Sequence, residues 1–224
     1  RTGSDGGMLN LQQGGTTQLS FISTSGNKPI MVESTNKGVK INPDSFQPRT
    51  SVNGAYDGEM SLGASTSRFK ACYLSHGVYL GGTGNANLLN DYEEGTWTCG
   101  ISNSAGDETS STTVAGQYTK IGRIVHVSVA ITGINNDAFS GGSLRITGLP
   151  FAVKNSTHSR GNGAAQFNNF NDSNAGKYFV QGIQNTQTAQ IKYNINNGVA
   201  ASVDVQRLNS SDTSAIIMDL TYIS

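Results

Sequence analysis

The chain has 224 residues, a mass of 23.5 kDa and 15 basic against 15 acidic residues, so its formal net charge is zero. This balance excludes the basic field that sequence-independent nucleic-acid binding needs, and no apolar run reaches the roughly 18 residues of a membrane helix. Gly, Ser, Asn and Thr supply more than two fifths of the chain, which disfavours long helices. We therefore expect an all-β protein whose thin cores gain burial from partner chains.

Residues 1–85 contain short apolar bursts that each follow a glycine. The bursts begin at Gly7, Gly38, Gly58 and Gly77 and alternate apolar with polar residues, as short strands do. Strands this short need neighbours, which further copies of the same chain can supply by winding together. We expect an intertwined β shaft over 1–85. The alternative is a loop-rich meander packed on the second half of the chain.

The second half is typical of a globular antiparallel domain. Apolar residues occupy alternate positions over 125–131, as in a half-buried strand. Similar alternation predicts strands over 189–195, 199–205 and 216–222, with a hairpin at Asn197-Gly198. One helical turn is expected near 86–90. These elements predict a β-sandwich or jelly-roll-like head over 96–224, preceded by a neck over 86–95.

Four blocks in order along the chain resemble bacteriophage tail-fibre and related virion fibre proteins. They are SLGASTSRFKACYLSHGVYLGG (61–82), ANLLNDYEEGTWT (86–98), YTKIGR (118–123) and ITGLPF (146–151). Asn90 stands where the family usually has Asp, and Cys99 stands where a Pro commonly follows the Thr. Beyond residue 151 no further block is similar.

The resemblance implies a homotrimeric fibre whose distal β domain contacts the host. It implies a virion protein made in the bacterial cytoplasm, with three kinds of partner: two further copies of the chain, other tail proteins, and a bacterial surface glycan or outer-membrane protein. Adhesion of this kind needs no cofactor. Two alternatives stay open: a structural virion part such as a head fibre or baseplate piece, and a polysaccharide-degrading tailspike.

Residues suited to catalysis or metal binding are sparse, so we expect a protein that is not an enzyme and has no metal site. His76, His126 and His158 lie in no metal-ligand or hydrolase motif. The acidic stretch 91–94 offers carboxylates for a glycosidase pair or for calcium, but a solvated linker, or a set of partners for Arg68 and Lys70, is the stronger interpretation. Cys72 and Cys99 are expected to be reduced thiols.

The stretch 155–178 mixes aromatic rings, amides and charges that suit a glycan or protein receptor. The candidate receptor-binding residues are His158, Arg160, Phe167, Asn168, Phe170, Asp172 and Tyr178. The alternative is that the phenylalanines are buried strand residues and the asparagines serve turns. The loop 135–142 is a second candidate. Trp97 is expected to pack in the core, with a sugar-stacking platform as its alternative.

Overall fold

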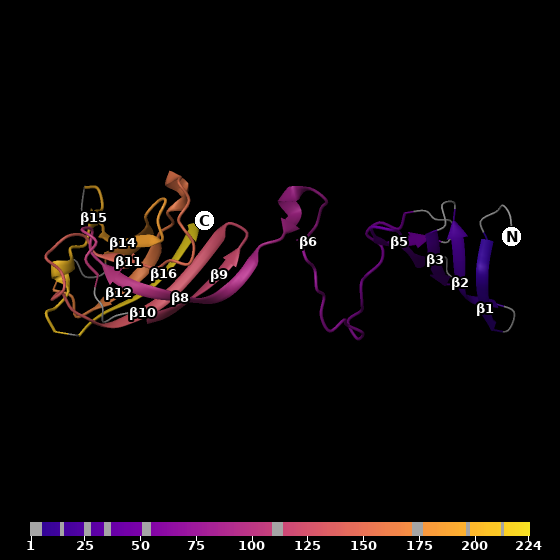
Figure 1. The fold of residues 1–224 in the computed structure, drawn as a ribbon, viewed down its shortest axis with the longest axis horizontal. Helices are drawn as coiled ribbons and strands as arrows, with labels where there is room; N and C mark the ends of the chain where they lie inside the picture. Colours follow the sequence, from indigo (N-terminus) through magenta and orange to yellow (C-terminus); the bar gives the residue numbers. More distant parts are fainter. Residues whose placement is uncertain are drawn as a thin grey trace. The chain divides into compact units, whose positions relative to one another are not determined.

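The computed structural model describes residues 6–13, 16–24, 28–33, 37–50, 55–108, 114–171, 177–195, 198–211 and 213–224. It is nearly all β, with 49% strand and 5% helix, which confirms the expected class. The chain divides into two compact units, Arg1–Tyr73 and Leu74–Ser224 (Figure 1). This division falls inside the segment expected to be the shaft.

The first unit contains a five-stranded antiparallel meander in which sequence neighbours pair. Its strands are β1 (Gly6–Gln13), β2 (Thr16–Thr24), β3 (Lys28–Glu33), β4 (Lys37–Ile41) and β5 (Phe46–Thr50). The bursts after Gly7 and Gly38 lie in β1 and β4, as predicted. The burst after Gly58 is not a strand, because Gly58 has a φ of +73° within a turn and residues 59–62 pair with no other described residues.

Residues 55–91 contain little regular structure. An isolated bridge joins Ala64 to Ser67, β6 (Val78–Tyr79) pairs with β7 (Leu88–Leu89), and a 3-10 helix, η1, spans Asn85–Asn87. The helical turn expected near 86–90 is therefore this 3-10 turn. The next strand already begins at Tyr92, within the segment expected to be a neck.

The second unit closes eight antiparallel strands into a sandwich-like barrel (Figure 1). Its strands are β8 (Tyr92–Ser102), β9 (Val114–Ile121), β10 (Ile124–Ile134), β11 (Arg145–Thr147), β12 (Gly163–Asn168), β13 (Tyr178–Gly182), β14 (Thr188–Tyr193), β15 (Ala201–Ser202) and β16 (Ser214–Ile223). The order is β11-β8-β9-β10-β16-β12-β13-β14, with β11 also paired to β14 and β15 added beside β14. β8 pairs with β9 and β11, and β12 pairs with β16 and β13. These two strands are therefore the corners that join a sheet containing β9, β10 and β16 to an opposite sheet containing β11, β13 and β14.

Period-two alternation builds the core as predicted. Every second residue of β10 from Val125 to Ile131 faces inwards and is at most 6% exposed. Each stands opposite a buried residue of β16, for example Val127 opposite Leu220 and Val129 opposite Met218. The predicted strands over 125–131 and 216–222 are thus confirmed.

The strand predicted over 199–205 is largely wrong. Only Ala201–Ser202 is a strand, since the Asp204 side chain accepts a hydrogen bond from the Gln206 backbone N–H at 2.9 Å and caps a 3-10 helix, η3 (Val205–Arg207). The loop of this hairpin is also longer than the predicted Asn197-Gly198 turn, because the strands on either side pair through Tyr193 and Ala201. Asn197 itself lies outside the described residues.

Two aromatic side chains of the β8–β9 hairpin each cover a glycine on the opposite strand. Trp97 stands opposite Gly116, and Tyr118 stands opposite Gly95. A Cβ on Gly116 would lie 2.3 Å from Trp97 Nε1, while the indole N–H donates to the Gln117 carbonyl at 3.2 Å. Trp97 is 5% exposed, which confirms that it packs in the core.

We predict that Gly116→Ala lowers the free energy of unfolding by about 1–3 kcal/mol, because the added methyl group must displace the indole ring. Trp97 is the only tryptophan, so its fluorescence reports both the unfolding transition and the local environment in the folded state. Gly84→Ala is the control, since its Cβ would meet nothing closer than 3.9 Å. Equal stability of the two variants would contradict the packing described here.

Candidate functional site

The structure distributes the seven candidate receptor-binding residues over separate places. Phe167, Phe170 and Tyr178 come together, His158 and Arg160 lie elsewhere, and Asn168 is exposed at the end of β12. Asp172 lies outside the described residues. The seven therefore do not form a single contiguous surface in the described part of the chain.

Phe167, Phe170 and Tyr178 form a half-buried aromatic cluster against the core. The ring centroid of Phe167 lies 4.7 Å from that of Phe170 and 4.5 Å from that of Tyr178, and Tyr193 lies 6.4 Å from Tyr178. Rings that cover one another leave little free face for a sugar. The arrangement favours the packing alternative, and receptor binding by these rings stays a prediction.

Arg160 and His158 lie at the other end of β13 from Tyr178. The Gly182 backbone N–H donates to the Arg160 carbonyl at 2.9 Å, and four residue steps along β13 span about 13 Å. The Arg160 Nε and Nη2 groups both donate to Gln184 Oε1, at 3.2 and 2.7 Å. His158 is exposed on a 3-10 helix, η2 (Thr157–Ser159).

The second candidate, the loop 135–142, is firmly anchored. Asn103 is fully buried, and its amide donates to Asp107 Oδ2 at 2.7 Å and to the Gly141 carbonyl at 2.8 Å. Phe139 is buried, and its carbonyl accepts a hydrogen bond from Gln206 Nε2 at 3.0 Å. Ala138 and Ser140 remain exposed between these anchors.

The blocks 86–98, 118–123 and 146–151 converge on one cluster, which we call the entry cluster: Asp91, Glu93, Tyr118, Lys120 and Phe151. The Lys120 side chain is 10% exposed, forms an ion pair with Asp91 and lies 5.3 Å above the Phe151 ring. Tyr118 meets Phe151 edge-on at 5.6 Å and donates its hydroxyl to Glu93. This hydrogen bond raises the pKa of Tyr118.

The entry cluster assigns structural partners to the acidic stretch 91–94. Asp91 and Glu93 contact Lys120 and Tyr118, and Glu94 accepts the Tyr92 hydroxyl at 2.9 Å, which raises the pKa of Tyr92. The Gly122 backbone N–H also donates to the Asp91 carbonyl at 2.7 Å. These contacts support the linker interpretation of the stretch, because they fix where the chain enters the barrel.

The described residues contain no cluster suited to a metal ion and no disulfide. No three or more His, Cys, Asp or Glu side chains gather there in a way that could hold a metal ion. Cys72 is exposed and Cys99 buried, neither is bridged, and burial raises the pKa of the Cys99 thiol to about 12. None of the described helices has the length and apolar character needed to cross a membrane.

Sequence reasoning overlooked a row of polar side chains that crosses three strands. Arg145 of β11 stands opposite Gln190 of β14, which stands opposite Gln181 of β13. Gln190 Nε2 donates to Gln181 Oε1 at 3.4 Å, and Gln181 Nε2 donates to Asn162 Oδ1 at 2.9 Å. We call this row the polar ladder. Its members lie far apart in the sequence, so only strand register reveals it.

No protein-family model matches the chain, and the search of curated proteins finds no similar sequence.

We predict that Asp91→Asn lowers the free energy of unfolding by about 1–2 kcal/mol, because it leaves the Lys120 ammonium without its counter-charge in a mostly buried position. Urea denaturation measures the change. Asp137→Asn, in an exposed turn, is the matched control and should leave the midpoint unchanged. Identical midpoints for both variants would show that the entry cluster contributes nothing to stability.

We also predict a loss of stability at high pH that involves Tyr222. Burial raises the pKa of Tyr222 to about 12 from an ordinary 10.0. The folded state then holds this proton more tightly, so the contribution is complete below pH 10 and declines as the pH rises towards 12. Chemical denaturation at several pH values in this range gives the free energy of unfolding. Its decrease with pH should be shallower in Tyr222→Phe than in the wild type by about 1.4 kcal/mol per pH unit. Parallel curves for Tyr222→Phe and the wild type would contradict the assignment.

Proposed function

We propose that this chain is the distal part of a homotrimeric bacteriophage fibre that attaches the virion to a bacterial surface. In this proposal 1–85 form the intertwined shaft, 86–95 the neck and 96–224 the receptor-binding head. The four ordered blocks that resemble virion fibre proteins support it. The observation that carries it is the uncovered apolar surface of residues 60–80.

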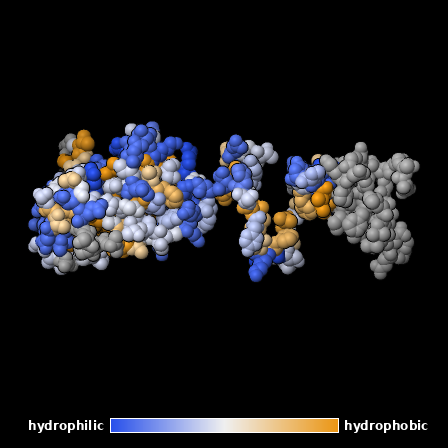
Figure 2. Space-filling model, in the orientation of Figure 1, coloured by the Kyte–Doolittle hydropathy of each residue, from blue (hydrophilic) through white to orange (hydrophobic). Residues whose placement is uncertain are grey.

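Large apolar side chains in this segment face solvent in the single chain. Tyr73 is 95% exposed, Leu62 73% and Phe69 65%, and further exposed apolar residues are Leu74, Val78, Tyr79 and Leu80. Figure 2 shows hydrophobic side chains of this segment at the surface. Among residues 37–50, 55–108 and the described residues that follow them, the buried apolar residues all belong to 97–222. Exposed large apolar side chains in such number mark an interaction site.

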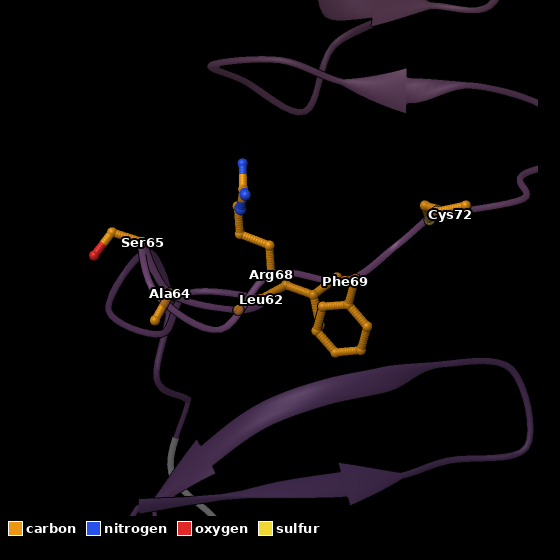
Figure 3. A pocket seen from close by; sticks show the side chains of 8 residues that line it. Leu62, Ala64, Ser65, Arg68, Phe69 and Cys72 are labelled. Atoms are coloured by element: carbon orange, nitrogen blue, oxygen red, sulfur yellow. The ribbon is translucent and has the colours of Figure 1, made fainter.

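An open hollow in the same segment can receive an apolar side chain. It has a volume of about 490 Å³ and is lined by Leu62, Arg68 and Phe69 among others (Figure 3). Backbone hydrogen bonds between Ala64 and Ser67, at 3.0 and 3.1 Å, hold its wall as a tight turn. Exposed rings such as Tyr73 and Tyr79 of a second copy are suitable occupants.

Trimerisation would give the head its adhesive strength. Three copies on one fibre convert a weak single contact into strong attachment through their effective concentration. This mechanism needs no covalent chemistry.

We predict that light scattering gives a mass of about 70 kDa, three times that of the 23.5 kDa chain. The double variant Phe69→Ser and Leu80→Ser should shift the protein towards monomer, because it removes apolar contact area between copies. Val199→Ser, which alters an 88% exposed residue of the head, is the control and should remain trimeric. A stable wild-type monomer would refute the fibre assignment.

Labelled protein added to a panel of Gram-negative and Gram-positive strains tests the adhesive part of the proposal. We expect retention on at least one strain, and retention by the double variant that is weaker by roughly 100-fold or more. Binding of the trimer to none of the strains would overturn the attachment function.

A further inference from the structure

The outer face of β11, β14 and β13 carries a different chemistry from the rest of the head. Ile146, Ile191 and Val180 of these strands are buried, so the alternate residues face outwards. The central outward row is the polar ladder. In the adjacent rows, Lys192 stands opposite Phe179, and Thr147 stands opposite Thr188. All these outward residues are half-exposed. We call this surface the ladder face.

Among the described residues, no carboxylate forms an ion pair with a cation of the ladder face. The ion pair found among the described residues joins Lys120 to Asp91, and neither Arg145 nor Lys192 forms an ion pair there. The Nε–H group of Arg145 is buried without a hydrogen-bond partner. Because this group is buried, a ligand at the surface can reach only the remaining N–H groups of the guanidinium.

Acidic residues are placed at the margins of the ladder face. The outward positions of β11, β14 and β13 contain no Asp or Glu, and the nearest in the sheet, Glu108 and Asp204, form bridges with Ser102 and Ser143. The opposite sheet differs. Its outward residues include Asp219, Glu94 and small neutral side chains such as Ala130, with no Lys or Arg.

We propose that the ladder face binds a polysaccharide bearing uronic-acid carboxylates on the bacterial surface. The proposal rests on the attachment function above and assigns it a site and a ligand class. The Arg145 guanidinium has the fork geometry that pairs with a carboxylate, and Lys192 adds a second positive charge. The amides of Gln190 and Gln181 can donate to and accept from sugar hydroxyls, while the Phe179 ring offers an apolar surface for a sugar C–H face.

The test measures binding of the 224-residue chain, as its trimer, to purified capsular polysaccharides, half of them carrying uronic acids and half neutral. Each uronic-acid polymer is paired with its carboxyl-reduced form, which keeps the sugar skeleton and removes the charge. We expect binding to at least one acidic polymer and none to its reduced form. Arg145→Gln and Lys192→Gln should each weaken this binding about tenfold or more.

Arg123→Gln is the matched control, because it removes one exposed positive charge from the β9–β10 turn and should leave the affinity unchanged. Thermal denaturation of each variant verifies the fold. Equal binding of the acidic and reduced polymers would overturn the ligand class, and wild-type affinity in Arg145→Gln would overturn the site. Retention on bacteria without binding to any acidic polymer would refute this inference and leave the attachment function standing. Binding to neither bacteria nor polymers would refute both.

Discussion

Closure of the head depends on a strand of three residues. β11 pairs with β8 on one side and β14 on the other, so the eight-stranded ring has no free edge. Ile146 lies at the centre of β11, opposite Ile101 and Ala189, and all three side chains are buried. Immediately after β11, Gly148 has a φ of +82°, and a Cβ there would lie 2.0 Å from the Thr98 carbonyl oxygen. Only glycine lets the backbone turn away this close to β8.

The closed ring separates inward positions, which pack in the core, from outward positions, which form the surface. The blocks 86–98, 118–123 and 146–151 contribute to the entry cluster and to strands beside it, where Lys120 and Tyr118 both contact Phe151. Their role in this chain is to hold the barrel and its entering segment. Outward positions on the strands contribute little to that packing, so they can carry charge and amides at small cost to stability. The ladder face uses such positions.

The candidate site was only partly predictable. Phe167, Phe170 and Tyr178 were candidates for receptor binding, and in the structure their rings pack against the core and cover each other. Arg160 was grouped with them by proximity in sequence, although an extended chain carries it to the opposite end of β13. The pairing of Arg145 with Gln190 could not be predicted, because single polar residues in strands have no local sequence pattern that marks them as a site.

The sequence by itself determined the all-β class, the alternation of β10 and β16 and the burial of Trp97, because these follow from local composition and a period of two. Tertiary structure alone decided the register, the closure through β11, the shortening of β15 and the convergence of the entry cluster. The physical reason is that strand pairing joins residues far apart in the chain. The free energy that selects one pairing comes from the assembled core and not from either segment alone.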